Sequence, residues 1–110
     1  MVSKAVVPWI EGAPKERDIE KYLHKRVAEA GGEHRRVKWL GRNGAPDDVI
    51  LLHGANFVEC KAPGEDLKPH QAREHKRMKR RGVPVYVLAS YADVDRFMGH
   101  LLNQIAWEYV

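Results

Sequence analysis

Two carboxylates and one ammonium group in this sequence are spaced so that they could meet at one end of a small sheet. Asp47 stands directly before the apolar run 49–52, which is typical of a buried strand. A turn follows, and residues 57–61 predict a second strand. Because side chains alternate between the faces of a strand, Glu59 and Lys61 share one face. If the two strands form a hairpin, Asp47 lies near both of them.

Such a cluster is unfavourable without a counter-charge, because two neighbouring carboxylates repel and one of them takes up a proton at neutral pH. A divalent cation removes this conflict, and oxygen ligands favour hard ions such as Mg²⁺ or Mn²⁺. A bound ion could polarise a phosphoryl oxygen and generate hydroxide from a water molecule. Lys61 could orient that water or offset charge on the phosphorus. The three residues therefore predict metal-assisted chemistry at a phosphate group.

A second group of charged side chains forms a basic stretch that ends at Arg81. Residues 69–81 read as a helix with six cations within the nine residues 73–81, and Glu74 is the only acid among them. Dense charge on a helix is usually a solvated face, but such charge can also neutralise phosphates and release their counterions. Together with cations of the preceding loops, the candidate nucleic-acid contacts are Arg42, Lys68, Arg73, Lys76, Arg77 and Arg80.

One α/β domain of 110 residues must position these side chains, and its apolar content of 44% is sufficient for a core. Apolar residues at helical spacing and the glycines at 31 and 32 predict a first helix over residues 14–30. Ser90 is a good N-cap for a last helix that reaches residue 102. The remaining predicted elements are an arm at 1–13, strands at 33–40, 49–52, 57–61 and 83–88, a helix at 69–81, and a tail at 103–110.

Composition narrows the setting of the protein. Its apolar runs are too short to span a bilayer, and the N-terminus lacks the pattern of a signal peptide. Cys60 is the only cysteine, which excludes an internal disulfide and a cysteine-based zinc site. His70 and His75 are not at a standard ligand spacing, so we expect them to lie at the surface or to contact phosphate. We therefore predict a cytoplasmic protein with no membrane partner.

The order of elements and several short motifs together resemble a known group of nucleases. Pro46-Asp47, followed after an interval by Glu59-Cys60-Lys61, resembles the PD-(D/E)XK motif of the restriction-endonuclease-like nucleases. The resemblance narrows to the VRR-NUC (virus-type replication-repair nuclease) family, especially its short stand-alone phage and bacterial members, and covers roughly residues 15–90. The supporting motifs are Glu16-x-x-Ile19-Glu20, Gly31-Gly32, Gly44-x-Pro46-Asp47, Val58-Glu59-x-Lys61-Ala62-Pro63-Gly64, Pro69-x-Gln71 and Gly82 before the last strand.

The resemblance implies a fold and an activity. The fold is α/β, a core with the order α-β-β-β-α-β and a central mixed sheet, here followed by a C-terminal helix. The activity is metal-dependent hydrolysis of phosphodiester bonds in branched DNA, with Mg²⁺ or Mn²⁺ as the cofactor. Asp47 and Glu59 would hold the metal, and Lys61 would serve the attacking water. A glutamate of the first helix would join the site, with Glu16 as the first choice and Glu20 as the reserve.

Three further positions are assigned through the same resemblance. Gln71 matches a family glutamine at the start of the second helix and would orient the water, the metal shell or a phosphate. Cys60 would face the core and leave its backbone carbonyl free to bind the metal. Asp48 stands where the family more often has an apolar residue. By strand alternation Asp48 points away from Asp47, so we leave it out of the predicted site.

Two classes of function are consistent with the sequence. The first is a structure-selective endonuclease, which would cut four-way (Holliday) junctions as a homodimer or, alternatively, flaps or nicked DNA as a monomer. The second is a non-catalytic basic module that binds nucleic acid. The intact set of Asp47, Glu59 and Lys61 favours the enzyme, since a binder has no use for paired carboxylates facing phosphate. A sequence-specific restriction enzyme is disfavoured, because 110 residues leave little room for base-reading elements.

The homodimer prediction rests on apolar residues near both termini and on the resemblance, since the short stand-alone family members act as dimers. Such residues need cover, either from the domain's own sheet or from a second subunit, and a closed two-fold dimer is the commonest assembly. The residues concerned are Val6, Val7, Trp9, Ile10, Ile105, Trp107, Tyr109 and Val110.

Overall fold

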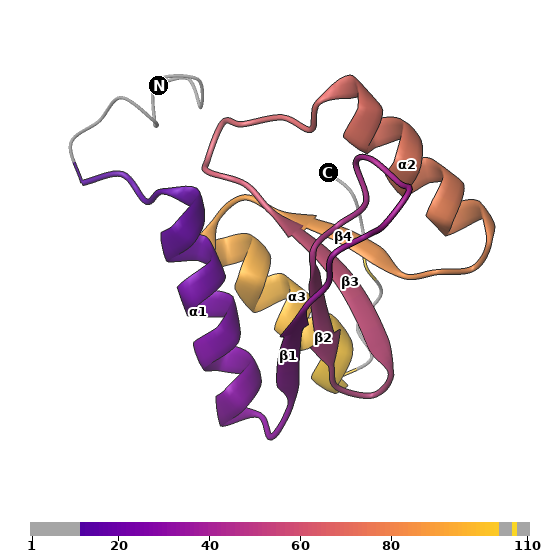
Figure 1. The fold of residues 1–110 in the computed structure, drawn as a ribbon. Helices are drawn as coiled ribbons and strands as arrows, with labels where there is room; N and C mark the ends of the chain where they lie inside the picture. The colour runs from indigo at the N-terminus through magenta and orange to yellow at the C-terminus, as the bar shows by residue number, and fades with distance from the viewer. Residues whose placement is uncertain (1–11, 104–106, 108–110) are drawn as a thin grey trace.

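A computed structural model, which describes residues 12–103 and Trp107, contains one mixed sheet with the strand order β1-β2-β3-β4 (Figure 1). The pairs β1–β2 and β2–β3 are antiparallel, and the pair β3–β4 is parallel. The strands are β1 (Glu33–Arg36), β2 (Asp48–Leu51), β3 (Ala55–Cys60) and β4 (Val85–Leu88). The hairpin of β2 and β3 is the one that the sequence predicted around Asp47 and Glu59.

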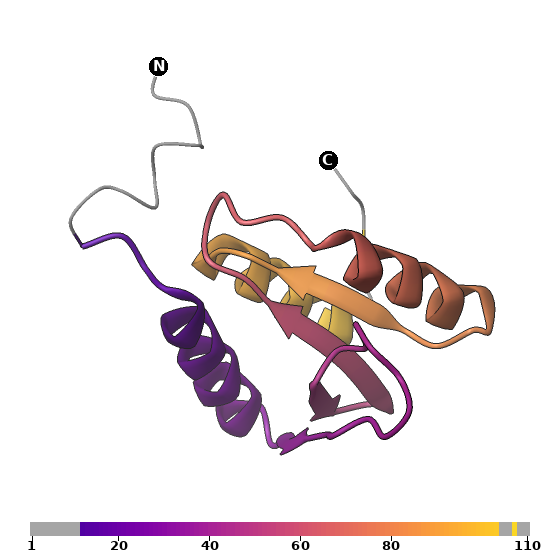
Figure 2. The same cartoon turned by 45° about the horizontal axis from the view of Figure 1, so that its top comes forward.

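Within residues 12–103, three helices cover the two faces of this sheet, namely α1 (Glu16–Glu29), α2 (Pro69–Arg80) and α3 (Tyr91–Asn103). The helices α1 and α3 pack against each other on one face, whereas α2 lies on the opposite face (Figure 2). The α2 crossover allows β4 to pair in parallel with β3, since parallel neighbours need a long connection. The observed order confirms the predicted α-β-β-β-α-β core with its added C-terminal helix.

The core lies between the sheet and the helix pair α1–α3. Three fully buried residues of α1 recur four positions apart: Ile19, Leu23 and Val27. In β3 the buried Val58 and Cys60 belong to this core, so Glu59 between them faces the α2 side. Burial of a large apolar side chain stabilises the fold by roughly 1.5–3 kcal/mol, so a slip of β3 by one residue would be strongly disfavoured.

The helix ends follow the signals in the sequence. Gly31 comes just after α1 with a φ of 82°, and a Cβ on Gly32 would lie only 2.9 Å from a methyl carbon of Val27. At the start of α3, the hydroxyl of Ser90 accepts a hydrogen bond from the Asp93 N–H at 2.9 Å. These contacts fix where α1 and α3 meet the sheet.

The first strand is shorter than predicted, and the extension to residue 40 is wrong. The chain leaves the sheet after Arg36, and the Trp39 indole N–H donates to the Pro46 carbonyl oxygen at 2.7 Å. The Trp39 ring packs against Phe57, while Leu40, the last residue of the predicted strand, is 86% exposed. All four residues of the edge strand β1 are exposed, so no buried face sets its length.

Most of the predicted arm and tail lies outside the described residues, including Val6, Val7, Trp9, Ile10, Ile105, Tyr109 and Val110. Trp107 is described, and its ring makes edge contacts with Tyr86 and Phe97 of its own domain. The Arg96 guanidinium lies 4.6 Å from the centre of that ring. No helix among the described residues is long and apolar enough to cross a membrane.

Candidate active site

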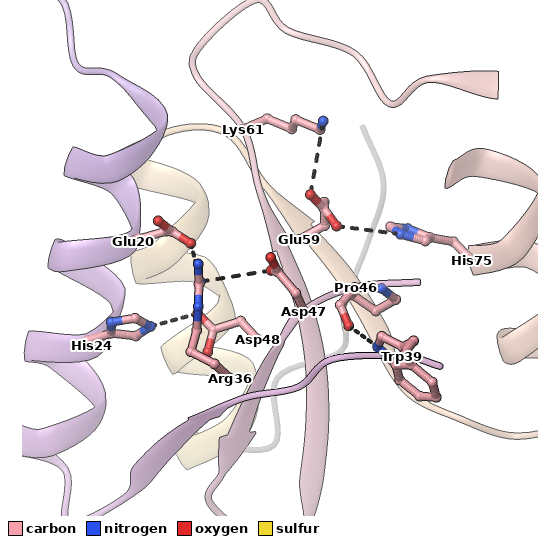
Figure 3. A network of polar contacts seen from close by, with 10 residues as sticks. All are labelled: Glu20, His24, Arg36, Trp39, Pro46, Asp47, Asp48, Glu59, Lys61 and His75. Carbon is pink, nitrogen blue, oxygen red and sulfur yellow. Dashed lines mark hydrogen bonds and ion pairs between the residues drawn. The ribbon is translucent and has the colours of Figure 1, made fainter. Parts of the chain in front are cut away.

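The predicted triplet of charged residues comes together at one end of the β2–β3 hairpin (Figure 3). Asp48 pairs with Val58, so continuing the antiparallel register places Asp47 opposite Glu59. Lys61 directly follows β3, and its buried Nζ lies 4.0 Å from Oε2 of Glu59. Two strands that meet at a tight turn thus place three residues distant in sequence in one cluster.

The negative charge of this cluster exceeds the positive charge that the fold supplies. The Glu59 side chain is 13% exposed, and burial, followed by repulsion from Asp47, raises the pKa of Glu59 to about 7. Lys61 lowers that pKa, but Glu16 and Glu20 raise it again. A divalent cation would relieve this repulsion, and the donors are the carboxylate oxygens that Mg²⁺ and Mn²⁺ prefer. The residues therefore fit the implied metal.

The two candidate glutamates of α1 lie on one side of the helix, one turn apart, and face different partners. Glu20 accepts a hydrogen bond from the Arg36 guanidinium at 2.6 Å, and the same guanidinium lies 3.9 Å from Asp47 (Figure 3). The pKa of Glu16 is raised by burial and then by Glu65, and it is lowered by Lys61. Glu16 therefore interacts electrostatically with the charged residues of the site. Arg36 was not predicted, and its place on an exposed strand gave no signal.

His75 is a residue of the site that the sequence interpretation missed. The expectation of a surface or phosphate-contacting residue is wrong for it, because its side chain is only 3% exposed and Nε2 lies 4.0 Å from Oε1 of Glu59 (Figure 3). Burial, and then the charge of Lys79, lower the pKa of His75, which favours the neutral imidazole. Its spacing from Met78 on the buried side of α2 was a signal that could have revealed it.

Two residues assigned through the family resemblance have clear structural roles. The Gln71 side-chain oxygen accepts a hydrogen bond from the Lys68 N–H at 2.9 Å, which caps the start of α2. Cys60 is buried in the core as expected, and burial raises the pKa of its thiol.

Gly44 has a φ of 84°, and a Cβ there would lie 2.6 Å from the His70 carbonyl oxygen. Glycine at 44 thus lets the preceding loop pack closely on the start of α2.

A basic cavity of about 290 Å³ lies where the loop before β2 meets α2, and its lining includes Arg42, Arg73 and Arg77. Buried Glu74 holds two of these arginines in place. Its Oε1 lies 2.5 Å from the Arg42 guanidinium and 3.1 Å from the Arg77 guanidinium. These contacts, with Arg42 first, lower the pKa of Glu74. The other predicted nucleic-acid contacts, Lys68, Lys76 and Arg80, are exposed.

The chain is similar in sequence and in structure to known proteins. No family model matches the chain. A protein named "Putative nuclease p44", from Acyrthosiphon pisum secondary endosymbiont phage 1, is 44% identical over 78 residues, which are 69% of this chain and 84% of that protein. A solved structure described as a VRR_NUC domain is 40% identical, with a TM-score of 0.71 over 80% of this chain and 98% of the other. The chain therefore belongs to the VRR-NUC family and has its PD-(D/E)XK-like core.

Proposed function

We propose that this protein is a metal-dependent, structure-selective DNA endonuclease that uses Mg²⁺ or Mn²⁺. The observation that carries the proposal is the meeting of Asp47, Glu59 and Lys61, where burial and repulsion raise the pKa of Glu59 to about 7. A carboxylate destabilised in this way within the free protein gains most from a bound cation. The names of the phage relative and of the similar structure support a nuclease.

Each residue of the site has a separate role in this proposal. Asp47 and Glu59 would hold the ion together with an α1 glutamate, Glu16 or Glu20, and the Cys60 carbonyl. When bound, the ion supplies Lewis acidity at the phosphoryl oxygen. Lys61, held by its buried side chain, positions the attacking water and offsets charge on the phosphate. His75 lies beside the Glu59 carboxylate, 4.0 Å away. Gln71, at the start of the helix that carries His75, would orient the water, the metal shell or a phosphate.

The DNA backbone would follow α2 toward this site. Glu74 and His75 are adjacent in the chain, yet Glu74 organises the arginine cavity while His75 faces Glu59. The exposed cations of α2 can therefore bind phosphates next to the one that is cut. Arginine pairs bind phosphate with defined geometry, and each neutralised phosphate adds affinity that falls with rising salt.

We further propose that the substrate is a four-way junction and that the protein acts on it as a homodimer. A junction has near two-fold symmetry and is resolved by two cuts, whereas one domain carries one carboxylate cluster. A two-fold dimer would present two clusters at a fixed separation. Trp107 packs within its own domain, so the interface would draw on the other apolar residues near the termini.

End-labelled four-way junction, flap, single-stranded and linear duplex DNA, each incubated with Mg²⁺, Mn²⁺ or EDTA, test this proposal. We expect paired symmetric nicks in the junction, dependence on the metal, and a dimer by light scattering at micromolar concentration. A monomer, free and junction-bound, that cuts flaps would replace the junction proposal with a flap nuclease. Binding of every substrate without cleavage in either metal would replace the enzyme with a nucleic-acid-binding module.

A further inference from the structure

A second cluster of metal-binding side chains lies at the edge of the sheet that faces α1. It contains His24 from α1, His34 from β1 and Asp48 from β2, and one ligand atom of each lies within 4.8 Å of the others. We propose that these residues bind a zinc ion that fastens α1 to the first two strands. Nothing in this argument depends on the nuclease proposal, and the cluster uses none of the proposed catalytic carboxylates.

Asp48 provides the strongest observation. Its side chain is fully buried, and Oδ2 lies 2.6 Å from Nε2 of His24 (Figure 3). Its other oxygen, Oδ1, is also buried and has no hydrogen-bond partner among the described residues. A buried acceptor left unpaired destabilises a fold, and more so if it is charged. A cation between Asp48 and the histidines would neutralise the carboxylate.

The two histidines are placed so that an ion can reach them. Their rings stack with centroids 3.6 Å apart and planes 4° from parallel, His34 is exposed, and the His24 side chain is 22% exposed. A stack of two imidazolium ions would be repulsive, whereas neutral imidazoles are metal ligands. Arg36 adds positive charge near Asp48, but its guanidinium is hydrogen-bonded to Glu20.

The donor set identifies the class of ion. Two imidazole nitrogens and one carboxylate oxygen suit zinc, which takes three protein ligands and a water, whereas Mg²⁺ prefers oxygen alone. Ligands of a tetrahedral zinc are about 3.3 Å apart, as bonds of about 2.0–2.1 Å require. Binding would therefore widen the 2.6 Å contact between His24 and Asp48 and turn the rings out of their stack. Exposed His34 can make that turn at the surface.

This site would act on the position of α1. His24 lies four residues after Glu20 and eight after Glu16, so all three occupy one side of the helix. Asp48 directly follows Asp47. Zinc bonds to His24, His34 and Asp48 would therefore fix the position of Glu16 and Glu20 relative to Asp47. The zinc site and His75 would lie on opposite faces of the sheet.

Titration of the whole protein with Co²⁺ and Zn²⁺ tests the site. Co²⁺ reports tetrahedral coordination through its visible absorption, and Zn²⁺ binding reports through the melting temperature Tm. The matched variants are His34→Asn and His53→Asn, because both histidines are exposed. Asn also tolerates the positive φ of 52° at His53. Asp47→Asn combined with Glu59→Gln removes the proposed catalytic carboxylates.

We expect visible Co²⁺ bands and a Zn²⁺-induced rise in Tm in the wild type, in His53→Asn and in the carboxylate double variant. His34→Asn should bind both ions at least about tenfold more weakly. Its Tm without metal shows whether it is folded, and the exposed position of His34 makes that outcome expected. Equal responses of His34→Asn and His53→Asn would overturn the zinc site, and so would loss of the response in the double variant.

Discussion

Glu59 and Glu74 are both almost buried, yet their surroundings shift their pKa values in opposite directions. The side chain of Glu74 is 7% exposed, and Arg42 and Arg77 lower its pKa by direct contact. The side chain of Glu59 is 13% exposed, and burial with repulsion from Asp47 raises its pKa to about 7 despite Lys61. Two arginines contact Glu74 directly, whereas Lys61, 4.0 Å from Glu59, does not cancel the upward shift of the Glu59 pKa. In the proposed function a bound ion supplies that missing positive charge. Under the proposed function, this contrast separates a structural carboxylate, Glu74, from a catalytic one, Glu59.

The largest expected effect is the loss of cleavage when the ion-binding charge is removed. Glu59→Gln or Asp47→Asn should lower the rate of junction cleavage at least about a thousandfold, because electrostatic stabilisation of the transition state depends on the ion. DNA affinity, measured in EDTA, should change little. Glu29→Gln removes an exposed glutamate of α1 and should retain full activity. Full activity of either site variant would refute its assignment as a metal ligand.

A smaller effect, on DNA affinity, is expected when exposed cations of α2 are neutralised. The triple variant Arg73→Gln, Lys76→Gln, Arg77→Gln should weaken binding to every DNA shape and reduce the slope of log affinity against log salt by about three. The matched control is Arg17→Gln, Lys21→Gln, Lys25→Gln, which removes the same charge from an exposed stripe of α1. If both triple variants bind alike, α2 does not face the DNA.

Stability should respond to the two glutamates with opposite signs. In metal-free wild-type protein, folded Glu59 keeps its proton up to about pH 7, while the unfolded chain loses it near the ordinary glutamate pKa of 4.5. The free energy of unfolding therefore falls between these pH values and levels off above them. Glu59→Gln should remove this decrease and stabilise the protein at pH 8 by about 3 kcal/mol. Urea unfolding at pH 5 and pH 8 in EDTA measures the difference.

The smallest expected effect belongs to Glu74→Gln. It removes the acceptor for two guanidinium groups and should destabilise the protein at pH 7 by about 1–2 kcal/mol. Since partners lower the pKa of Glu74, its contribution is present at neutral pH and disappears on acidification. The same urea series applies, and stabilisation by Glu74→Gln at pH 8 would remove the contrast with Glu59.

The sequence predicted the fold well because burial and turn chemistry leave local patterns. Alternation in residues 57–61 correctly separated Glu59 from the core residues Val58 and Cys60, and Ser90 correctly predicted the start of α3. The length of β1 was not predictable, because an exposed edge strand has no apolar alternation. Trp39, within the predicted strand 33–40, instead packs a loop against Phe57.

The sequence predicted only those residues of the candidate site that belong to a recognisable motif. Asp47, Glu59 and Lys61 followed from strand alternation and a hairpin, and the structure brings them together as expected. Arg36 and His75 reach the site from a different strand and from the buried side of α2, and such contacts depend on tertiary packing. The same is true of Asp48, which the sequence analysis left out of the predicted site and whose contact with His24 no sequence pattern revealed.

A Mg²⁺ titration followed by backbone amide NMR tests the central claim most directly, since Mg²⁺ avoids nitrogen ligands and reports on the carboxylate site alone. In the wild type we predict saturable shifts centred on residues 47, 59 and 61, with tighter binding at pH 8 than at pH 6 because the ion must displace the Glu59 proton. Glu59→Gln should lose these shifts and Glu74→Gln should retain them. Equal Mg²⁺ binding by Glu59→Gln and the wild type would contradict the account.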